Sequence, residues 1–318
     1  MEKKGRINLK FLIYGAGVIG SIFAGRLSAA GYDVTVLARG KRYDELKGNG
    51  LLLQNAYPDK RESCTVKIIS RLEADDIYDY VLVVMQKTQV PEVLPVLSQN
   101  KSPSIVFVVN NCLGYDDWIK TIGADRLMLG FPSAGGERRN GVVTYFIGKG
   151  LSRLFQTTTF AEYQGQKTKR LKILVTAFRN ANIPSVPCTH MDAWQKTHVS
   201  IVTSIGNALY KHSSDNYKLA GSKEDLVLMA GGIKEGLHVL KRLGYRVTPS
   251  KLLYFKLPAR ILAVVFHFIM NTRMAETAMA KHTIAARDEM RALQSDFNKL
   301  ILQSGLRTPC IDKLKAYL

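Results

Sequence analysis

Apolar runs alternate with amphipathic stretches along the first half of the chain. Runs that predict buried strands lie at 10–17, 33–39, 78–87 and 104–111, and a fifth is expected within 126–136. The stretch between the first two runs carries apolar or small residues on one face, which predicts a helix. Near-continuous Val, Ile and Leu are typical of strands buried on both faces of a parallel sheet. The pattern therefore predicts a doubly wound α/β domain with a mostly parallel sheet.

The pattern changes in the second half. Residues 141–165 are expected to be rich in strands, as a hairpin with polar connections, and 169–183 to form an amphipathic helix. Long helical patterns follow from about Met191 onward, and two of them end at Gly244 and Gly305, which are typical helix stops. We expect two domains, an α/β domain at 1–188 and an all-α domain at 189–318.

One apolar segment, at 261–270, resembles a membrane helix only in composition. It holds ten residues, whereas a spanning helix needs about 20. We interpret it as a buried or interface helix, so no membrane partner is expected and a homodimer stays open. Four cysteines, at positions 64, 112, 188 and 310, lack metal-ligand spacing. They predict reduced thiols in a cytoplasmic protein without a metal site.

The chain carries 45 Lys and Arg against 26 Asp and Glu, a formal net charge of +19. The excess is spread over both halves, and the one notable cluster is "RGKR" at 39–42. An anionic small molecule fits this charge. Binding to nucleic acid is kept as a minor alternative, which would show an affinity that depends steeply on salt.

A glycine-rich turn follows the first predicted strand and opens the first predicted helix. Gly15, Gly17 and Gly20 match G-x-G-x-x-G, which in this context indicates a Rossmann-type dinucleotide site. We expect the phosphates to lie on the loop and the helix N-terminus. The alternative is a tight turn without a ligand. The residues predicted to hold the cofactor here are Gly15, Ala16, Gly17, Val18, Ile19 and Gly20.

The end of the second predicted strand indicates which dinucleotide is bound. NAD enzymes usually place an acidic residue there for the ribose 2′-hydroxyl. This chain has Arg39 instead, and a guanidinium suits a 2′-phosphate. We therefore predict NADPH, the alternative being an ordinary solvated basic turn.

Several blocks spread along the chain carry a family resemblance. They read "IYGAGVIGS", "VLVVMQKTQ", "NNCLG", "FAEYQG", "AWQKTHVS" and "SGLRTPCIDKL". With these blocks the chain resembles the ketopantoate reductase family (2-dehydropantoate 2-reductases) over nearly its whole length. The resemblance implies a Rossmann domain, a helical C-terminal domain and an active site between them. It also implies NADPH-dependent reduction of ketopantoate to pantoate, a step of pantothenate biosynthesis.

The resemblance assigns roles to individual residues. It places Lys87, Asn111 and Glu162 near the cofactor. It makes Lys196 the catalytic lysine and Glu289, twenty residues before Pro309, the catalytic glutamate, with Asn111 aligning the reacting groups. The chemistry is consistent with these types, because hydride transfer leaves negative charge on the ketone oxygen and an ammonium can protonate it.

Departures from the family pattern affect the expected substrate pocket. Serines replace two family asparagines, a threonine replaces a serine, a lysine replaces an aspartate and Cys112 replaces a glycine. A more cationic pocket suits a more acidic substrate or one with a different tail. The residues predicted to bind substrate are Lys196, Ser200, Ser204, Thr277 and Glu289. Lys281, His198 and His282 are further polar residues expected near the site, the histidines as substrate contacts, as a proton relay or as packed or solvated side chains.

We therefore expect an NADPH-dependent reductase that converts a 2-oxo acid to a 2-hydroxy acid. Two alternatives remain at this point. One is a related oxidoreductase that acts on a different oxo acid or on an imine. The other is a regulator that binds NADPH without oxidising it.

Overall fold

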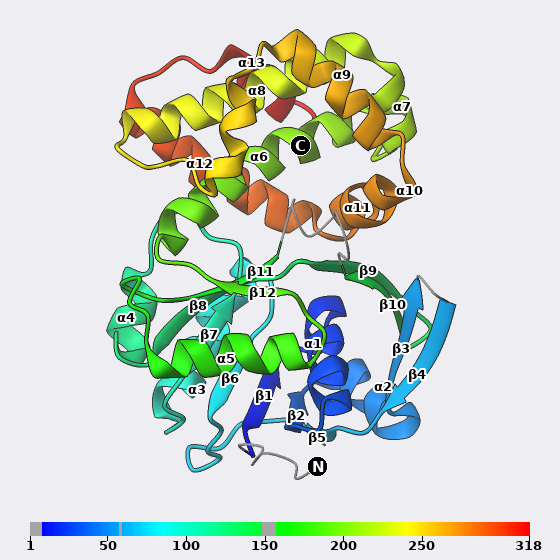
Figure 1. Cartoon of the computed structure of the whole chain (residues 1–318), viewed down its shortest axis with the longest axis vertical. Coiled ribbons are helices and arrows are strands. Elements are labelled where there is room, and N and C mark those ends of the chain that lie inside the picture. Colours follow the sequence, from blue (N-terminus) through cyan, green and yellow to red (C-terminus); the bar gives the residue numbers. More distant parts are fainter. Residues whose placement is uncertain (1–7, 57–58, 148–156) are drawn as a thin grey trace, which may run out of the picture. The chain divides into compact units, whose positions relative to one another are not determined.

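The structure is a computed structural model that describes residues 8–56, 59–147 and 157–318. The described residues divide into two compact units (Figure 1). The first unit contains residues up to Val109 and the segment Tyr115–Met191, and the second contains Asn110–Gly114 and Asp192–Leu318. The boundary expected after residue 188 thus differs by three residues from the observed one. In addition, the five residues 110–114 pack with the second unit.

The described residues of the first unit form an eight-stranded sheet in the order β12-β11-β8-β7-β6-β1-β2-β5. Its neighbouring strands are parallel except for the pair β11 and β8. The strands are β1 (Lys10–Tyr14), β2 (Asp33–Leu37), β5 (Lys67–Ile69), β6 (Tyr80–Val83), β7 (Ile105–Val108), β8 (Leu127–Phe131), β11 (Thr158–Glu162) and β12 (Ser185–Pro187). This is the expected doubly wound sheet with one antiparallel step.

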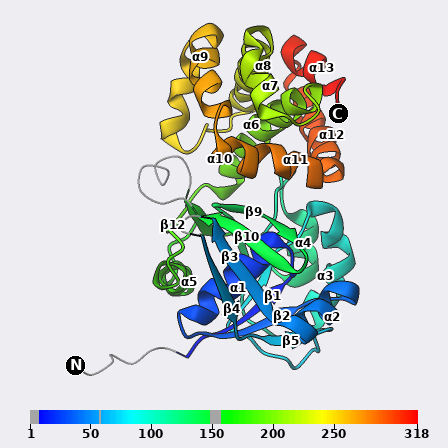
Figure 2. The ribbon, with the colours of Figure 1, turned by 90° about the vertical axis from the view of Figure 1, so that its right-hand side faces the viewer.

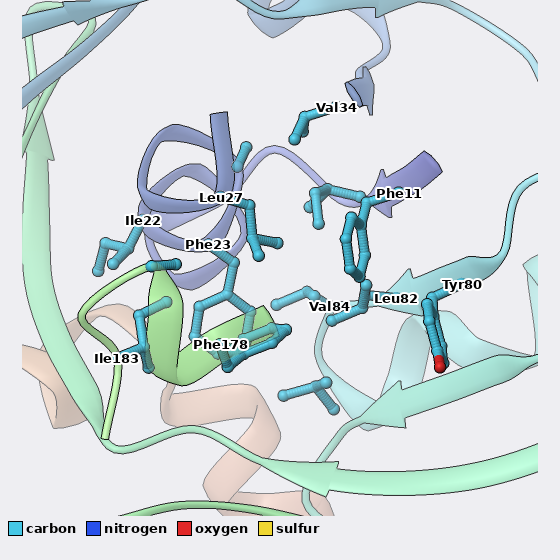
Figure 3. Close-up of a cluster of buried hydrophobic side chains, with 14 of the residues drawn as sticks. Phe11, Ile22, Phe23, Leu27, Val34, Tyr80, Leu82, Val84, Phe178 and Ile183 are labelled. Carbon is cyan, nitrogen blue, oxygen red and sulfur yellow. The ribbon is translucent and has the colours of Figure 1, made fainter. Parts of the chain in front are cut away.

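Helices connect these strands and build the core between them. They are α1 (Val18–Ala29), α2 (Gly40–Asn49), the 3₁₀ turn η1 (Lys87–Gln89), α3 (Val90–Gln99), α4 (Asp116–Ile122) and α5 (Lys169–Asn180). Thr168 begins α5 by accepting a hydrogen bond from Leu171 N. Phe23 of α1 meets Phe178 of α5 edge-to-face, with ring centres 4.9 Å apart (Figure 3). Burial of such aromatic side chains fixes both helices against the sheet.

A second, four-stranded sheet in the first unit was only partly expected. Its described strands, in the order β4-β3-β10-β9, are β3 (Leu51–Ala56), β4 (Asp59–Cys64), β9 (Ala134–Arg139) and β10 (Val142–Ile147). The hairpin expected within 141–165 is wrong in its pairing, because β10 pairs with the preceding β9 while β11 joins the large sheet. This sheet packs on α1, where a Cβ on Gly25 would lie 2.4 Å from Leu53 Cδ1.

The described residues of the second unit that form regular structure are all helical. The elements are α6 (Met191–Lys211), α7 (Asn216–Gly221), α8 (Lys223–Arg242), η3 (Ser250–Lys256), α9 (Ala259–Met270), α10 (Arg273–Ala275), the π-helical turn η4 (Glu276–Ala280), α11 (Lys281–Ala285), α12 (Arg287–Ser304) and α13 (Pro309–Lys315). Gly305 ends α12 in the left-handed conformation, at φ +67°. The predicted fold class, a Rossmann domain and an all-α domain, is confirmed.

The apolar segment at 261–270 lies in α9, which runs along the outside of the second unit (Figure 2). One face is buried in the helical core, through Leu262, Ala263, Phe266 and Met270. The exposed side carries the apolar residues Ile261, Val264, Val265 and Phe268 together with Arg260 and His267. Among the described residues, no helix has the length and hydropathy that crossing a membrane requires.

Candidate active site

The glycine loop joins β1 to α1, and its three glycines have different surroundings. A Cβ on Gly15 would lie 2.2 Å from Val84 O, and Gly15 also has φ +120°. A Cβ on Gly20 would lie 1.9 Å from Gly15 O. Apart from Gly17 itself and the residues on either side of it in the chain, no heavy atom lies within 4 Å of a Cβ built on Gly17. Gly15 and Gly20 are therefore required by packing, whereas Gly17 leaves open space beside the loop.

The start of α1 suits an anion. Gly17 caps the helix without a side-chain hydrogen bond, and the first turn contains no acidic residue. The N-terminal amides and the helix dipole favour a negative group at this place. Because Gly17 also leaves room for a close approach, the residues 15–20 fit the pyrophosphate of a dinucleotide.

Two arginines of the "RGKR" cluster differ in their surroundings. Arg42 Nε donates to Ala16 O at 3.1 Å, and its Nη2 donates to Ser21 Oγ at 3.2 Å. Arg42 Nη1 also pairs with Glu45 at 3.1 Å. Burial lowers the pKa of Arg42, and the hydrogen bond to Glu45 opposes that effect. Arg42 therefore stabilises the glycine loop through its hydrogen bonds to Ala16 and Ser21, a role that the sequence did not indicate.

Arg39 is exposed and directly precedes α2. Burial raises the pKa of Tyr14, and the positive charge of Arg39 partly offsets this. Since Tyr14 is the last residue of β1, the Arg39 charge acts next to the glycine loop. Arg39 is thus the exposed guanidinium at the position expected for a 2′-phosphate.

Lys87 and Glu162 belong to different parts of the large sheet, since Lys87 follows β6 and Glu162 ends β11, and β7 and β8 lie between these strands. Lys87 begins η1 after the carboxyl end of β6. The glycine loop follows the carboxyl end of the parallel strand β1, so both lie at the same end of these strands. Glu162 pairs with Met128 near the start of β8, and its carboxylate accepts from Arg170 Nε at 2.8 Å and Arg170 Nη2 at 2.5 Å. The structure does not bring Glu162 to the loop. Glu162 thus forms a structural ion pair with Arg170, and its place near the cofactor stays a prediction.

The predicted lysine lies near the start of α6 in the second unit. Lys196 is only 3% exposed, yet its ammonium forms an ion pair with Asp192 one turn earlier. Lys196 Nζ also lies 4.7 Å from the centre of the Tyr245 ring. A carboxylate and an aromatic face both stabilise an ammonium. This environment favours a charged donor over a neutral amine that attacks a carbonyl.

The predicted glutamate lies in the first turn of α12 and contacts the 110–114 loop. Glu289 is 5% exposed, and its Oε1 accepts a hydrogen bond from Asn110 Nδ2 at 3.1 Å. The sequence singles out the neighbouring Asn111, whose role in aligning the reacting groups stays a prediction. The Asn111 amide is used within the loop, where Nδ2 donates to Gly114 O at 2.5 Å and Oδ1 accepts from Leu113 N at 3.3 Å.

The residue after these asparagines explains why the loop packs with the second unit. Cys112 is 1% exposed and belongs to a core cluster with Val199 of α6 and Met290 of α12. Met290 also contacts α6 further along, since a Cβ on Gly206 would lie 2.7 Å from Met290 Cε. The replacement of a family glycine by Cys112 therefore supplies an apolar anchor for the loop.

The two predicted substrate serines face a neighbouring helix. A Cβ on Gly236 would lie 2.3 Å from Ser200 Oγ, and one on Gly232 would lie 3.0 Å from Ser204 Oγ. Ser200 is fully buried, and Ser204 Oγ donates to Ser200 O at 3.3 Å. These small residues let α6 and α8 approach closely.

The remaining predicted polar residues lie apart from that interface. Thr277 donates to Arg273 O at 3.0 Å, and Lys281 pairs with Glu276 at 3.7 Å. His198 stacks on Trp194 one turn earlier on α6, with ring centres 5.4 Å apart. The His282 side chain lies outside the described residues. Within the described ranges, no three His, Cys, Asp or Glu side chains gather in a way that could hold a metal ion.

Comparison with known proteins finds a family model that is similar to the first part of the chain. Residues 11–154 match the family model described as ketopantoate reductase PanE/ApbA. The resemblance to the ketopantoate reductase family is confirmed. A curated relative, the uncharacterized oxidoreductase YkpB of Bacillus subtilis, is 27% identical over 202 residues. That match covers 59% of this chain and 61% of the relative, so the chain spans less than two thirds of the relative's length.

Solved structures share the ketopantoate reductase fold over almost the whole chain. The 2-dehydropantoate 2-reductase of Geobacter metallireducens is similar with a TM-score of 0.79 and 18% identity, covering 98% of this chain and 99% of that one. D-mandelate dehydrogenase, solved with NADH and anilino(oxo)acetate, gives 0.76 and 16%, covering 97% and 96%. A dimeric ketopantoate reductase from Staphylococcus aureus gives 0.68 and 14%, covering 97% and 98%. At these identities the likeness establishes the fold.

Proposed function

We propose that this protein reduces the ketone of a 2-oxo acid with NADPH, as a 2-dehydropantoate 2-reductase does. The observation that carries the proposal is the buried Lys196 ammonium, held by Asp192 and the face of Tyr245. A buried charged donor of this kind can protonate an oxygen that gains negative charge. The family match of the first unit supports the same chemistry.

The first unit supplies the residues for the cofactor. The loop 15–20 would hold the pyrophosphate, Arg39 the 2′-phosphate, and Lys87 would lie near the cofactor at the same sheet edge. When bound, the reduced nicotinamide supplies the hydride. NADPH is proposed over NADH because the residue after β2 is a cation rather than an acid, although the similar D-mandelate dehydrogenase was solved with NADH.

The second unit supplies the residues for the substrate. Lys196 donates the proton to the ketone oxygen, and the Glu289 carboxylate orients the lysine and accepts a hydrogen bond from the substrate hydroxyl. Thr277 contributes a hydroxyl for the substrate carboxylate. We infer that Asn111 acts by shaping its loop. Ser200 and Ser204 act by setting how closely α6 and α8 approach, which changes the pocket without direct contact.

The substrate itself is proposed at the level of its class. Ketopantoate is the first candidate because of the family. A different 2-oxo acid is the second, and two observations favour keeping it. Ser200 and Ser204 replace family asparagines, and a similar fold is known in D-mandelate dehydrogenase with anilino(oxo)acetate. An imine substrate and a regulator without turnover remain outcomes of the test.

The deciding experiment follows NADPH absorbance while 2-oxo acids are screened, ketopantoate first. The expected result is oxidation of NADPH with at least one 2-oxo acid, reduced about 100-fold or more in Lys196→Ala. Binding of NADPH to that variant, measured by fluorescence, should be retained. NADPH binding without oxidation by any acid would support the regulator. Unchanged turnover in Lys196→Ala would remove this lysine from the mechanism.

We also propose a homodimer that uses the exposed face of α9, and a cytoplasmic location for which the four free cysteines are the support. An exposed apolar patch of this kind is typical of a surface that contacts another protein. The similar S. aureus protein is described as dimeric. Val264→Glu should convert a dimer to a monomer in light scattering, whereas Lys256→Glu should not. A wild-type monomer would refute the dimer.

A further inference from the structure

The side-chain amide of Asn110 has one engaged atom and one atom without a partner. Asn110 Nδ2 donates to Glu289 Oε1 at 3.1 Å. Asn110 Oδ1 is buried and, among the described residues, has no hydrogen-bond partner. Because Nδ2 is the atom that donates to Glu289, Oδ1 is the atom of the amide that is left to accept a hydrogen bond. The carbonyl oxygen therefore keeps its capacity to accept a hydrogen bond.

The surroundings hold this amide in place. On one side Asn110 follows Val109, the residue after β7, and on the other side Asn111 closes the loop through Gly114 O. Cys112 fixes the loop in the core cluster that contains Met290, the residue after Glu289. Both ends of the Asn110–Glu289 hydrogen bond are thus attached to the same packed cluster. The arrangement is that of a fixed support for a carboxylate.

We propose that Asn110 is a positioning residue, which fixes the Glu289 carboxylate through Nδ2 and accepts, at Oδ1, an N–H or O–H donor of the bound ligand. The identity of that ligand rests on the proposed function. The carboxamide of a nicotinamide and the hydroxyl of a 2-hydroxy acid are both donors of this kind. Buried polar atoms are almost always paired, and a ligand donor would pair this one.

The first test does not depend on activity. The side-chain amide signals of Asn110 in NMR spectra, assigned by their loss in Asn110→Asp, should move in Glu289→Gln. Their chemical shifts should also change when NADP⁺ alone or pantoate alone is added. The ligand that changes them is the one that supplies the donor to Oδ1. Chemical shifts that stay the same in Glu289→Gln would overturn the positioning role. Chemical shifts that stay the same with both ligands would overturn the acceptor role.

The second test compares two buried asparagines by kinetics. Asn207 is a matched control, because its Nδ2 donates to Gln294 Oε1 at 2.8 Å and its Oδ1 also lacks a partner among the described residues. Asn110→Ala should lower kcat by about 10- to 100-fold, the effect of one hydrogen bond to a charged group. Its KM for NADPH should rise if the nicotinamide supplies the donor to Oδ1, and stay within about twofold if the substrate does. Asn207→Ala should keep kcat within about threefold.

The outcomes separate this inference from the proposed function. Equal kcat losses in the two alanine variants would show a general structural effect and overturn the positioning role. Asn110→Asp keeps the side-chain size and loses the donor, so it should lose kcat as Asn110→Ala does, even if the alanine variant folds poorly. A wild type that turns over no 2-oxo acid would contradict the proposed function, while the Glu289→Gln spectra would still decide the support of Glu289.

Discussion

The ammonium of Lys196 lies 4.7 Å from the centre of the Tyr245 ring, with the Asp192 carboxylate as its ion-pair partner. The ring contacts the cation with its electron-rich face, so Tyr245→Phe should preserve the interaction. Tyr245→Leu should lower kcat by roughly 3- to 30-fold, corresponding to a buried cation–π contact. Steady-state kinetics of both variants tests this. If leucine and phenylalanine behaved alike, the ring would have no role in holding the lysine.

The glycine loop allows loss of stability to be separated from loss of binding. Gly20→Ala should lower the free energy of unfolding by about 1–3 kcal/mol, because the added Cβ would overlap Gly15 O. Gly17→Ala should change it by less than about 1 kcal/mol, but it should weaken NADPH binding. Thermal melts and fluorescence titrations provide the two readouts. Full NADPH affinity in Gly17→Ala would place the pyrophosphate elsewhere.

Substitution of the two arginines after β2 should affect different properties, cofactor binding for Arg39 and thermal stability for Arg42. Arg39→Ala should raise the KM for NADPH by about 10- to 100-fold and leave the KM for NADH almost unchanged, since only NADPH carries the 2′-phosphate. Arg42→Ala should lower the melting temperature, because it removes hydrogen bonds to Ala16 O and Ser21 Oγ. A clear preference of the wild type for NADH would refute the NADPH assignment.

The buried pair of Glu162 and Arg170 should matter for stability alone. Glu162→Gln leaves the guanidinium without its carboxylate and should cost roughly 3 kcal/mol of unfolding free energy. Its KM for NADPH should stay within about twofold of the wild type. Chemical denaturation and kinetics measure the two effects. A large rise in KM together with normal stability would restore Glu162 to the cofactor site.

Asp225 should make the stability of the second unit depend on pH. Burial acts to raise the pKa of this carboxyl, but hydrogen bonds from Lys211, His212 and Ser222 outweigh it and lower the pKa below its ordinary value. A carboxyl with a lowered pKa in the folded state stabilises it fully above the ordinary pKa, about 3.9, and progressively less as the pH falls further. Asp225→Asn should therefore be less stable than the wild type at pH 7, and the gap should narrow below about pH 4. A gap that stays constant down to pH 2 would contradict this.

The sequence predicted the parallel sheet and the long helices because their patterns are local. Continuous apolar strands and the stops at Gly244 and Gly305 require no knowledge of distant contacts. The second sheet was partly missed, because β4 reads "DKRESC" and gains its place only by pairing with β3. The same limit applies to the site. Asn110 and Asn111 are alike in sequence, and only the position of Glu289, 179 residues from Asn110, distinguishes them.

The loop that carries Cys112 belongs to the second unit, although its codons lie within the part of the gene that encodes the first unit. The chain leaves the first unit after Val109, returns at Tyr115 and leaves it again after Met191. A truncation at residue 191 would expose Cys112, which is normally buried in a core cluster of the second unit. It would also remove Glu289, the hydrogen-bond partner of Asn110. Recombination between relatives would therefore have to exchange residues 110–114 together with the helical half.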